Sequence, residues 1–148
     1  MFAWHSSCSM EARVEKGLMV KILLADDDKN FGTVLKNELE EERHVVDVVH
    51  DGVEAVLRFM NHAYDFVLLD LRMPRLNGIE ALRIIKTINP DTPAITFSGK
   101  AGDFEMKESL NCGAMKCFKK PFVIAEIRES IRNFSLTSSL SLKGEEEG

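Results

Sequence analysis

The 148-residue sequence has few of the features that mark membrane, secreted or thiolate-metal proteins. No stretch approaches the roughly 20 consecutive apolar residues that a membrane-spanning helix requires. The amino-terminal segment also lacks the apolar centre of a signal peptide. Three cysteines, Cys8, Cys112 and Cys117, have no metal-ligand spacing and indicate reduced thiols in the cytoplasm. The four histidines form no cluster, so none is expected to act as a ligand or a base.

The sequence also has no basic cluster, apart from the short pair Lys119–Lys120. Its formal net charge is −5, which argues against nucleic acid as a direct partner. No membrane partner is expected either. The length suits one domain, and the content of 45% hydrophobic and 29% charged residues is typical of a soluble globular protein.

The two ends of the chain lack the periodicity of secondary structure. Residues 1–18 are expected to form a flexible amino-terminal extension, and an upstream start codon is one explanation for it. Residues 135–148 are rich in serine, end in Gly-Glu-Glu-Glu-Gly, and are expected to form a disordered acidic tail. Residues 19–134 would be the folded domain.

Within this domain, short apolar runs alternate five times with segments of helical periodicity. The expected strands are residues 20–25, 45–49, 65–70, 94–98 and 115–118. The apolar positions expected to mark the intervening helices include Val34, Val56, Leu57, Met60, Ile88, Phe104 and Leu110. Such alternation predicts an α/β fold, a doubly wound (βα)5 five-stranded parallel sheet with flavodoxin-like strand order 2-1-3-4-5.

Polar side chains follow these strands at their carboxyl ends, which parallel pairing brings to one edge. Asp26 and Asp27 follow the first strand, and Asp70 ends the third. Ser98 ends the fourth strand, and Lys120 follows the fifth. Three carboxylates would repel one another without a cation, and hard oxygen ligands favour Mg²⁺. A carboxylate nucleophile, a metal, a hydroxyl and an ammonium are the components that phosphoryl transfer needs.

Three segments at these strand ends resemble the motifs of response-regulator receiver domains, including chemotaxis-regulator-like proteins. They are the first strand with its acidic residues, 22–28, the segment 70–78 and the Lys-Pro-Phe of 120–122. The resemblance implies that Asp70 accepts a phosphoryl group from a phosphohistidine on a histidine kinase or phosphotransfer protein. It would make the protein a phosphoacceptor switch that assists its own phosphorylation and dephosphorylation, and not an enzyme.

The same resemblance implies a role for each site residue. Asp26, Asp27, Asp70 and the backbone carbonyl of Arg72 would hold Mg²⁺. Ser98 and Lys120 would be the catalytic residues that contact the phosphoryl oxygens. Each residue also has a simpler interpretation, since aspartates at strand ends often cap helices or turns and paired lysines often face solvent.

Three further positions are expected to adjust this chemistry or its consequences. Cys117 stands where many receivers have Tyr or Phe, and it is too small to signal by swinging a ring. We therefore expect a different or weaker switch there. Arg72 and Lys100 lie at the expected mouth of the site, where cationic side chains would slow self-dephosphorylation relative to small residues.

The 14 residues after Phe134 are too few for an output domain. This predicts a single-domain response regulator that signals through a downstream output protein, on the surface from the fourth to the fifth helix. Two alternatives stay open. One is a receiver-like scaffold that works without phosphorylation, and the other is a small Mg²⁺-dependent aspartate phosphohydrolase.

Overall fold

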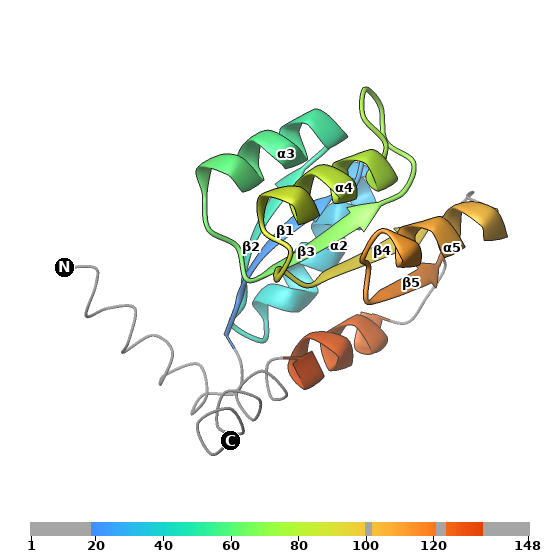
Figure 1. Cartoon of the computed structure of the whole chain (residues 1–148). Helices are drawn as coiled ribbons and strands as arrows, with labels where there is room; N and C mark the ends of the chain where they lie inside the picture. The colour runs from blue at the N-terminus through green and yellow to red at the C-terminus, as the bar shows by residue number, and fades with distance from the viewer. Residues whose placement is uncertain (1–18, 100–101, 121–123, 135–148) are drawn as a thin grey trace, which may run out of the picture.

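The computed structural model describes residues 19–99, 102–120 and 124–134 (Figure 1). In this part of the chain, the strands are β1 (Lys21–Ala25), β2 (Val45–Val49), β3 (Phe66–Asp70), β4 (Ala94–Ser98) and β5 (Lys116–Lys119). The helices are α2 (Lys29–Glu40), α3 (Gly52–Asn61), α4 (Gly78–Ile88), α5 (Asp103–Asn111) and a last helix over residues 124–134. The predicted extension, the predicted tail and Lys100 lie outside the described residues.

All neighbouring strands pair in parallel, in the order β2-β1-β3-β4-β5. Leu24 of β1 lies opposite Leu68 of β3, and Asp70 lies opposite Phe97 of β4. The predicted doubly wound fold and strand order are confirmed. Because every strand runs in the same direction, the carboxyl ends of all five strands meet at one edge.

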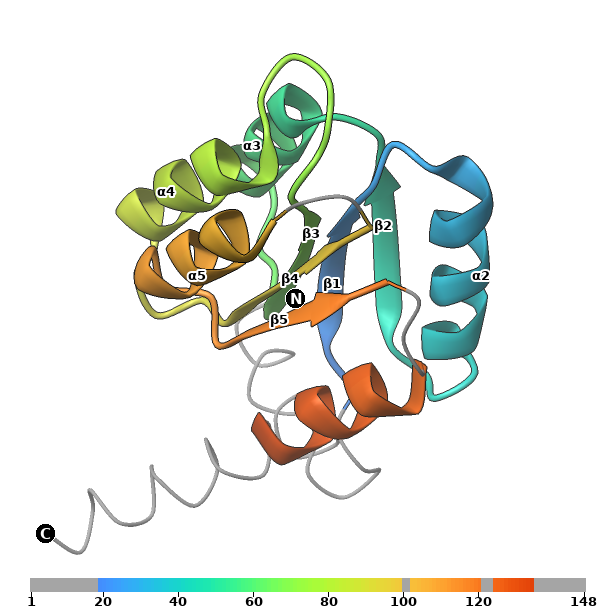
Figure 2. The ribbon, with the colours of Figure 1, turned by 90° about the vertical axis from the view of Figure 1, so that its right-hand side faces the viewer.

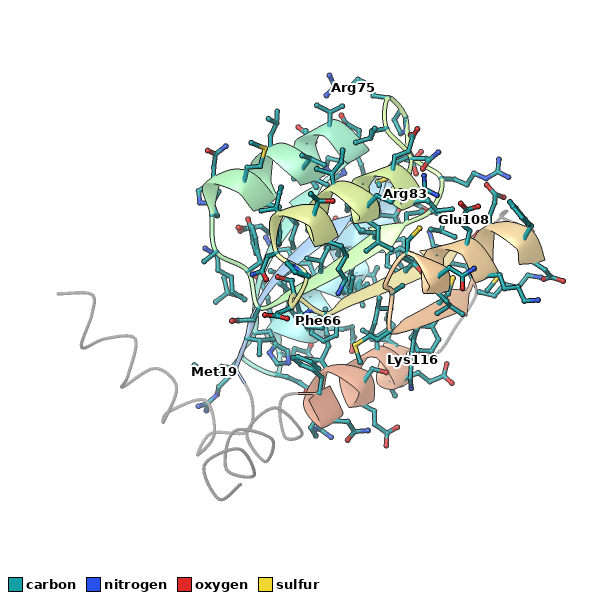
Figure 3. All side chains as sticks on the ribbon, in the orientation of Figure 1. Met19, Phe66, Arg75, Arg83, Glu108 and Lys116 are labelled. Carbon is teal, nitrogen blue, oxygen red and sulfur yellow. The ribbon has the colours of Figure 1, made fainter. Side chains whose placement is uncertain are left out.

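Helices cover both faces of the sheet (Figures 1 and 2). On one face α3 and α4 pack against the sheet, with a core that includes Leu23, Leu69 and Leu82. On the other face α2 and the 124–134 helix enclose a second core that includes Leu24 and Ile127. α5 lies beside α4, and Arg83 of α4 donates to Glu108 of α5 over 2.6 Å (Figure 3).

Side chains in the strand-to-helix connections fix the starts of α2 and α4. Asp28 caps α2 and accepts from the backbone N–H of Asn30 and Phe31. α4 begins with a capping box, in which Asn77 and Glu80 each accept from the other's backbone N–H. The strand-to-helix connections at the site edge are therefore short and held by hydrogen bonds.

Six apolar residues that helical spacing placed on buried faces are exposed instead, so that part of the prediction is wrong. These residues are Val34, Leu57, Met60, Ile88, Phe104 and Leu110. Small residues take the buried positions, including Gly52 and Ala55 in α3 and Ser109 in α5. A helix can approach a sheet closely through small side chains, and a pattern that weights large apolar residues misses this.

Within the residues that the structure describes, no helix has both the length and the apolar character needed to cross a bilayer.

Candidate functional site

Three carboxylates converge where β1 and β3 end at the carboxyl edge. Asp70 is the last residue of β3, and Asp26 and Asp27 follow β1. One carboxylate oxygen from each lies within 4.8 Å of the others. Asp26 and Asp70 are buried, whereas Asp27 is exposed. The structure thus brings together the three acids that the sequence singled out.

The ammonium of Lys120 joins two of these carboxylates. Its Nζ donates to Oδ2 of Asp26 over 3.0 Å and to Oδ2 of Asp70 over 3.1 Å. The backbone N–H of Lys120 also donates to the Ser98 carbonyl over 2.7 Å, which fixes the lysine against the end of β4. One cation therefore lies between two buried acids contributed by different strands.

Backbone N–H groups hold the other oxygen of each buried acid. Asp28 N–H donates to Oδ1 of Asp26 over 2.8 Å, and Arg72 N–H donates to Oδ1 of Asp70 over 2.9 Å. Each carboxylate is therefore held by one neutral donor and one shared cation. This arrangement fixes the orientation of both groups before any ligand arrives.

Burial and neighbouring charges together shift the pKa values of two groups at the site. Burial, together with the neighbouring Asp70 carboxylate, raises the pKa of Asp26 from 3.8 to about 6, against the opposing effect of its hydrogen bonds from Asp28 and Lys120. Burial alone would lower the pKa of Lys120, but the carboxylates of Asp26 and Asp70 outweigh it and raise that pKa. The site therefore retains a cation and has an excess of negative charge that a divalent metal would relieve.

The backbone after Asp70 turns too tightly to admit a side chain at Gly78. Leu71 N–H donates to the Phe97 carbonyl over 2.9 Å, and Gly78 N–H donates to the Leu71 carbonyl over 3.0 Å. A Cβ at residue 78 would lie 2.2 Å from the backbone oxygen of Asp70. Gly78 thus lets α4 begin directly against the backbone of Asp70.

A second contact fastens the same loop to the start of α3. A Cβ at Gly52 would lie 1.9 Å from the carbonyl oxygen of Leu76, so the two backbones touch. Arg75, which has a φ of 67°, donates to the Asp51 carboxylate over 2.8 Å. Asp51 is also the cap of α3 and accepts from Glu54 N–H over 2.8 Å. The loop after Asp70 is therefore held at its start, by the bond from Leu71 to β4, and near its end, by the contacts of Arg75 and Leu76.

The remaining predicted residues lie around this centre, apart from Lys100, which is outside the described residues. Ser98 is buried at the end of β4. The Arg72 guanidinium lies 2.9 Å from Glu105 of α5 in an exposed ion pair. Cys117 is partly buried in β5, opposite Thr96. Thr96 in turn contacts Ser109 of α5, with 2.9 Å between their hydroxyl oxygens.

Three residues that surround the acids and Lys120 were not predicted from the sequence to lie at the site. The ring of Phe31 lies 4.4 Å from Lys120 Nζ, measured to its centroid. His50 Nδ1 donates to the backbone carbonyl of Asp26 over 3.1 Å. Glu105 accepts from Arg72. Phe31 lies three residues after the acidic motif of residues 22–28, and His50 directly follows β2. This closeness to segments at the site edge is the one signal in the sequence that could have identified them.

The family model for the response regulator receiver domain matches residues 22–132. Response regulator ArlR of Staphylococcus saprophyticus is 33% identical over 130 residues, which cover 85% of this chain and 59% of that protein. Response regulator ArlR of Staphylococcus aureus strain Mu50 is 34% identical over 114 residues, covering 77% of this chain and 52% of that protein. The chain thus spans between half and three fifths of the length of these curated relatives.

Solved structures of receiver domains share the fold. The receiver domain of the Francisella response regulator 1452 superposes with a TM-score of 0.74 at 32% identity, covering 80% of this chain and 98% of that one. A CheY-like receiver domain protein from Methanospirillum hungatei JF-1 has a TM-score of 0.76 at 26% identity, covering 88% and 99%. The chain belongs to the response regulator receiver domain family of two-component systems.

Proposed function

We propose that Asp70 accepts a phosphoryl group from a phosphohistidine of a sensor histidine kinase or a phosphotransfer protein. The observation that carries this proposal is the convergence of Asp26, Asp27 and Asp70 within 4.8 Å, with Lys120 Nζ 3.1 Å from Asp70. An acid cluster that only capped helices would not need a partly buried lysine from the end of another strand. The family match supports the same chemistry.

In the proposed reaction, an Asp70 carboxylate oxygen attacks the phosphorus of the donor. A phosphorus–oxygen bond forms, the phosphorus–nitrogen bond breaks, and the electron pair leaves with the donor imidazole. Lys120 supplies a fixed positive charge beside the attacked group, and Ser98 donates a hydrogen bond to a phosphoryl oxygen. When water attacks the phosphorus of the aspartyl phosphate, the bond to the Asp70 oxygen breaks, inorganic phosphate leaves and the carboxylate is restored.

The oxygen donors at the site suit a hard divalent cation such as Mg²⁺. Asp26, Asp27, Asp70 and the backbone carbonyl of Arg72 would hold it. When bound, Mg²⁺ offsets negative charge on the phosphoryl oxygens. The raised pKa of Asp26 supports this assignment, because it reports a carboxylate whose charge is poorly compensated by protein groups alone.

Phosphorylation would act as a switch whose output passes to another protein or module. The output surface we propose extends from α5 over β5 to the 124–134 helix, and Cys117 lies in its middle strand. Arg72 would lengthen the phosphate's lifetime by shielding it from water, and the same role stays predicted for Lys100. The proposed domain is residues 19–134, acting in the cytoplasm.

Intact mass spectrometry tests the proposal most simply. The protein is incubated with Mg²⁺ and acetyl phosphate, and we expect one phosphoryl adduct that is absent in Asp70→Asn and absent when EDTA replaces Mg²⁺. Asp28→Asn is the matched control. It removes a carboxylate beside the cluster but keeps a residue able to cap α2, so it should still form the adduct.

Two other outcomes would favour the alternatives. A wild-type protein that forms no adduct in Mg²⁺ would point to a scaffold that works without phosphorylation. Turnover of a generic phosphate ester that persists in Asp70→Asn would point to a phosphohydrolase built on the Asp-x-Asp pair of Asp26 and Asp28.

A further inference from the structure

We propose that Phe31 is a positioning residue for phosphoryl transfer, because its ring fixes the Lys120 ammonium beside Asp70. This inference rests on the proposed function. It concerns an aromatic side chain outside the group of acids, hydroxyl and lysine that would carry out the reaction. The step it affects is the stabilisation of charge on the phosphoryl group by Lys120.

The Lys120 ammonium is enclosed by four groups. Its Nζ hydrogen-bonds Asp26 and Asp70, over 3.0 and 3.1 Å. The same atom lies 4.4 Å from the centroid of the Phe31 ring and 5.3 Å from that of Phe97. Both distances are within the range of about 6 Å in which a cation is attracted to an aromatic face. An ammonium has three N–H donors, and two of them are occupied by the carboxylates.

The Phe31 ring is itself held in place. Phe31 lies in the first turn of α2, and its backbone N–H donates to the Asp28 cap over 3.2 Å. Its ring packs on Phe97 with 5.5 Å between centroids, and Phe97 is fully buried in β4. The face that meets Lys120 is therefore oriented by the helix cap and by the core.

Lys120 needs such a constraint because the strand that it follows, β5, provides little packing. β5 is an edge strand, and none of its residues is buried. The side chain of Lys120 runs past Gly99, where a Cβ would lie 3.6 Å from Lys120 Cδ. A lysine stem has several rotatable bonds, so the charge would be poorly localised without contacts at its end. The ring restricts the ammonium to the position between the two acids.

The location of the charge matters for the reaction because Lys120 has to be in place when charge develops on the phosphoryl group. A group that is already fixed costs no reorganisation at that moment. We expect Phe31→Leu, which keeps an apolar side chain against Phe97, to slow phosphoryl uptake from acetyl phosphate about threefold, as expected for loss of one cation–π contact at a partly exposed site. Phe31→Tyr should keep the wild-type rate.

A series of fluorinated phenylalanines at position 31 separates this role from packing. Successive fluorination weakens the negative potential of the ring face while nearly preserving its shape, so the uptake rate should fall stepwise with each added fluorine. Phe104→Leu is the matched control, since Phe104 also lies in the first turn of a helix but is 77% exposed. Its uptake rate should equal that of wild type.

The positions of the Lys120 side-chain NMR signals give a readout that does not depend on phosphorylation. In the unphosphorylated protein the Lys120 Hε signals should be shifted upfield by the ring and should return toward solvent values in Phe31→Leu. A Hε shift unchanged by Phe31→Leu, or an uptake rate that is flat across the fluorinated series, overturns the inference. A wild-type protein with the Hε shift but no phosphoryl adduct would instead overturn the proposed function and leave the ring contact established.

Discussion

The centre of the sheet and its β5 edge are built in opposite ways, although both contribute to one site. Every residue of β3 is buried, and β3 ends in Asp70. No residue of β5 is buried, and α5 beside it buries only Ser109. The centre thus fixes the proposed nucleophile by packing, whereas Lys120 from the edge is fixed by hydrogen bonds and aromatic contacts.

The two regions also expose different surfaces. Around α5 and β5, Phe104, Leu110 and Met115 are exposed although all three are large and apolar. The buried contact between the neighbouring strand β4 and α5 is polar, through the hydroxyls of Thr96 and Ser109. A region held by few apolar contacts opens at lower free energy than the core. The proposed nucleophile therefore lies in the stable centre of the fold, and the less stable region of α5 and β5 lies next to it.

The largest effect should follow from crowding the backbone of the central region. In Gly78→Ala, the new Cβ would overlap the backbone of Asp70 and Leu71, and neither can move without displacing the end of β3. We expect a loss of about 4 kcal/mol in the free energy of unfolding, measured by urea denaturation. Gly102→Ala meets no atom within 4 Å and should change it by less than about 1 kcal/mol. Similar losses of stability in both variants would show that the backbone around residue 78 is no more crowded than that around residue 102.

A second test compares apolar truncations in the two regions. Leu68 of β3 is fully buried, whereas Leu110 of α5 is 45% exposed. Leu68→Ala should lower the free energy of unfolding by about 3 kcal/mol, through lost burial and the cavity left behind. Leu110→Ala should change it by less than about 0.5 kcal/mol. If Leu110→Ala proved as costly, α5 would belong to the core and the contrast would disappear.

The third test concerns the charge crowded at the end of β1. In the folded protein the pKa of Asp26 is about 6, above its ordinary value of 3.8, so the folded state binds the proton more tightly. Stability should therefore fall as pH rises from about 4 to about 6 and level off above that, with Asp26 accounting for about 3 kcal/mol.

Urea denaturation in EDTA, across this pH range, would measure that fall. Asp26→Asn has no ionisable group at this position. The fall in its stability with pH should therefore be smaller, by the amount that Asp26 contributes in the wild type. Equal pH dependence in the two proteins would show that Asp26 is not strained by its neighbours. Mg²⁺ should recover the lost stability in the wild type and not in Asp26→Asn.

A smaller effect should come from the hydroxyl pair between β4 and α5. Thr96 and Ser109 are both fully buried, and their hydroxyls contact each other. Replacing either residue therefore removes this contact from the hydroxyl that remains. Thr96→Val and Ser109→Ala should each cost about 1–2 kcal/mol, and the double variant should cost less than their sum. Additive losses in this double-mutant cycle would show that the two hydroxyls act independently.

The smallest effect on stability should come from the exposed pair that joins the loop after Asp70 to α5. Removing the Arg72 side chain should leave the denaturation midpoint unchanged, since exposed ion pairs contribute little. Arg72→Ala should nevertheless shorten the lifetime of the phosphorylated protein, followed by intact mass after removal of the donor. An unchanged lifetime would remove Arg72 from the proposed shielding of the phosphate.

The sequence was sufficient for the sheet and for the acids, and insufficient for the surroundings of Lys120. Strand ends in a parallel sheet must meet, so Asp26 and Asp70 could be placed together from the pattern alone. Phe31 could not be placed over Lys120, because helical spacing does not say which ring faces which cation. Likewise, the exposed Phe104 and the buried Ser109 of α5 reverse what apolar spacing predicts, since close helix packing selects for size as well as polarity.

Chemical mapping of the phosphorylated residue tests the central claim most directly. An aspartyl phosphate is reduced by borohydride to homoserine, which peptide mass spectrometry locates in the chain. After incubation with Mg²⁺ and acetyl phosphate, we predict homoserine at position 70 and none at positions 26, 27 or 28. Homoserine at another aspartate, with position 70 unmodified, would contradict the assignment of Asp70 as the phosphoacceptor.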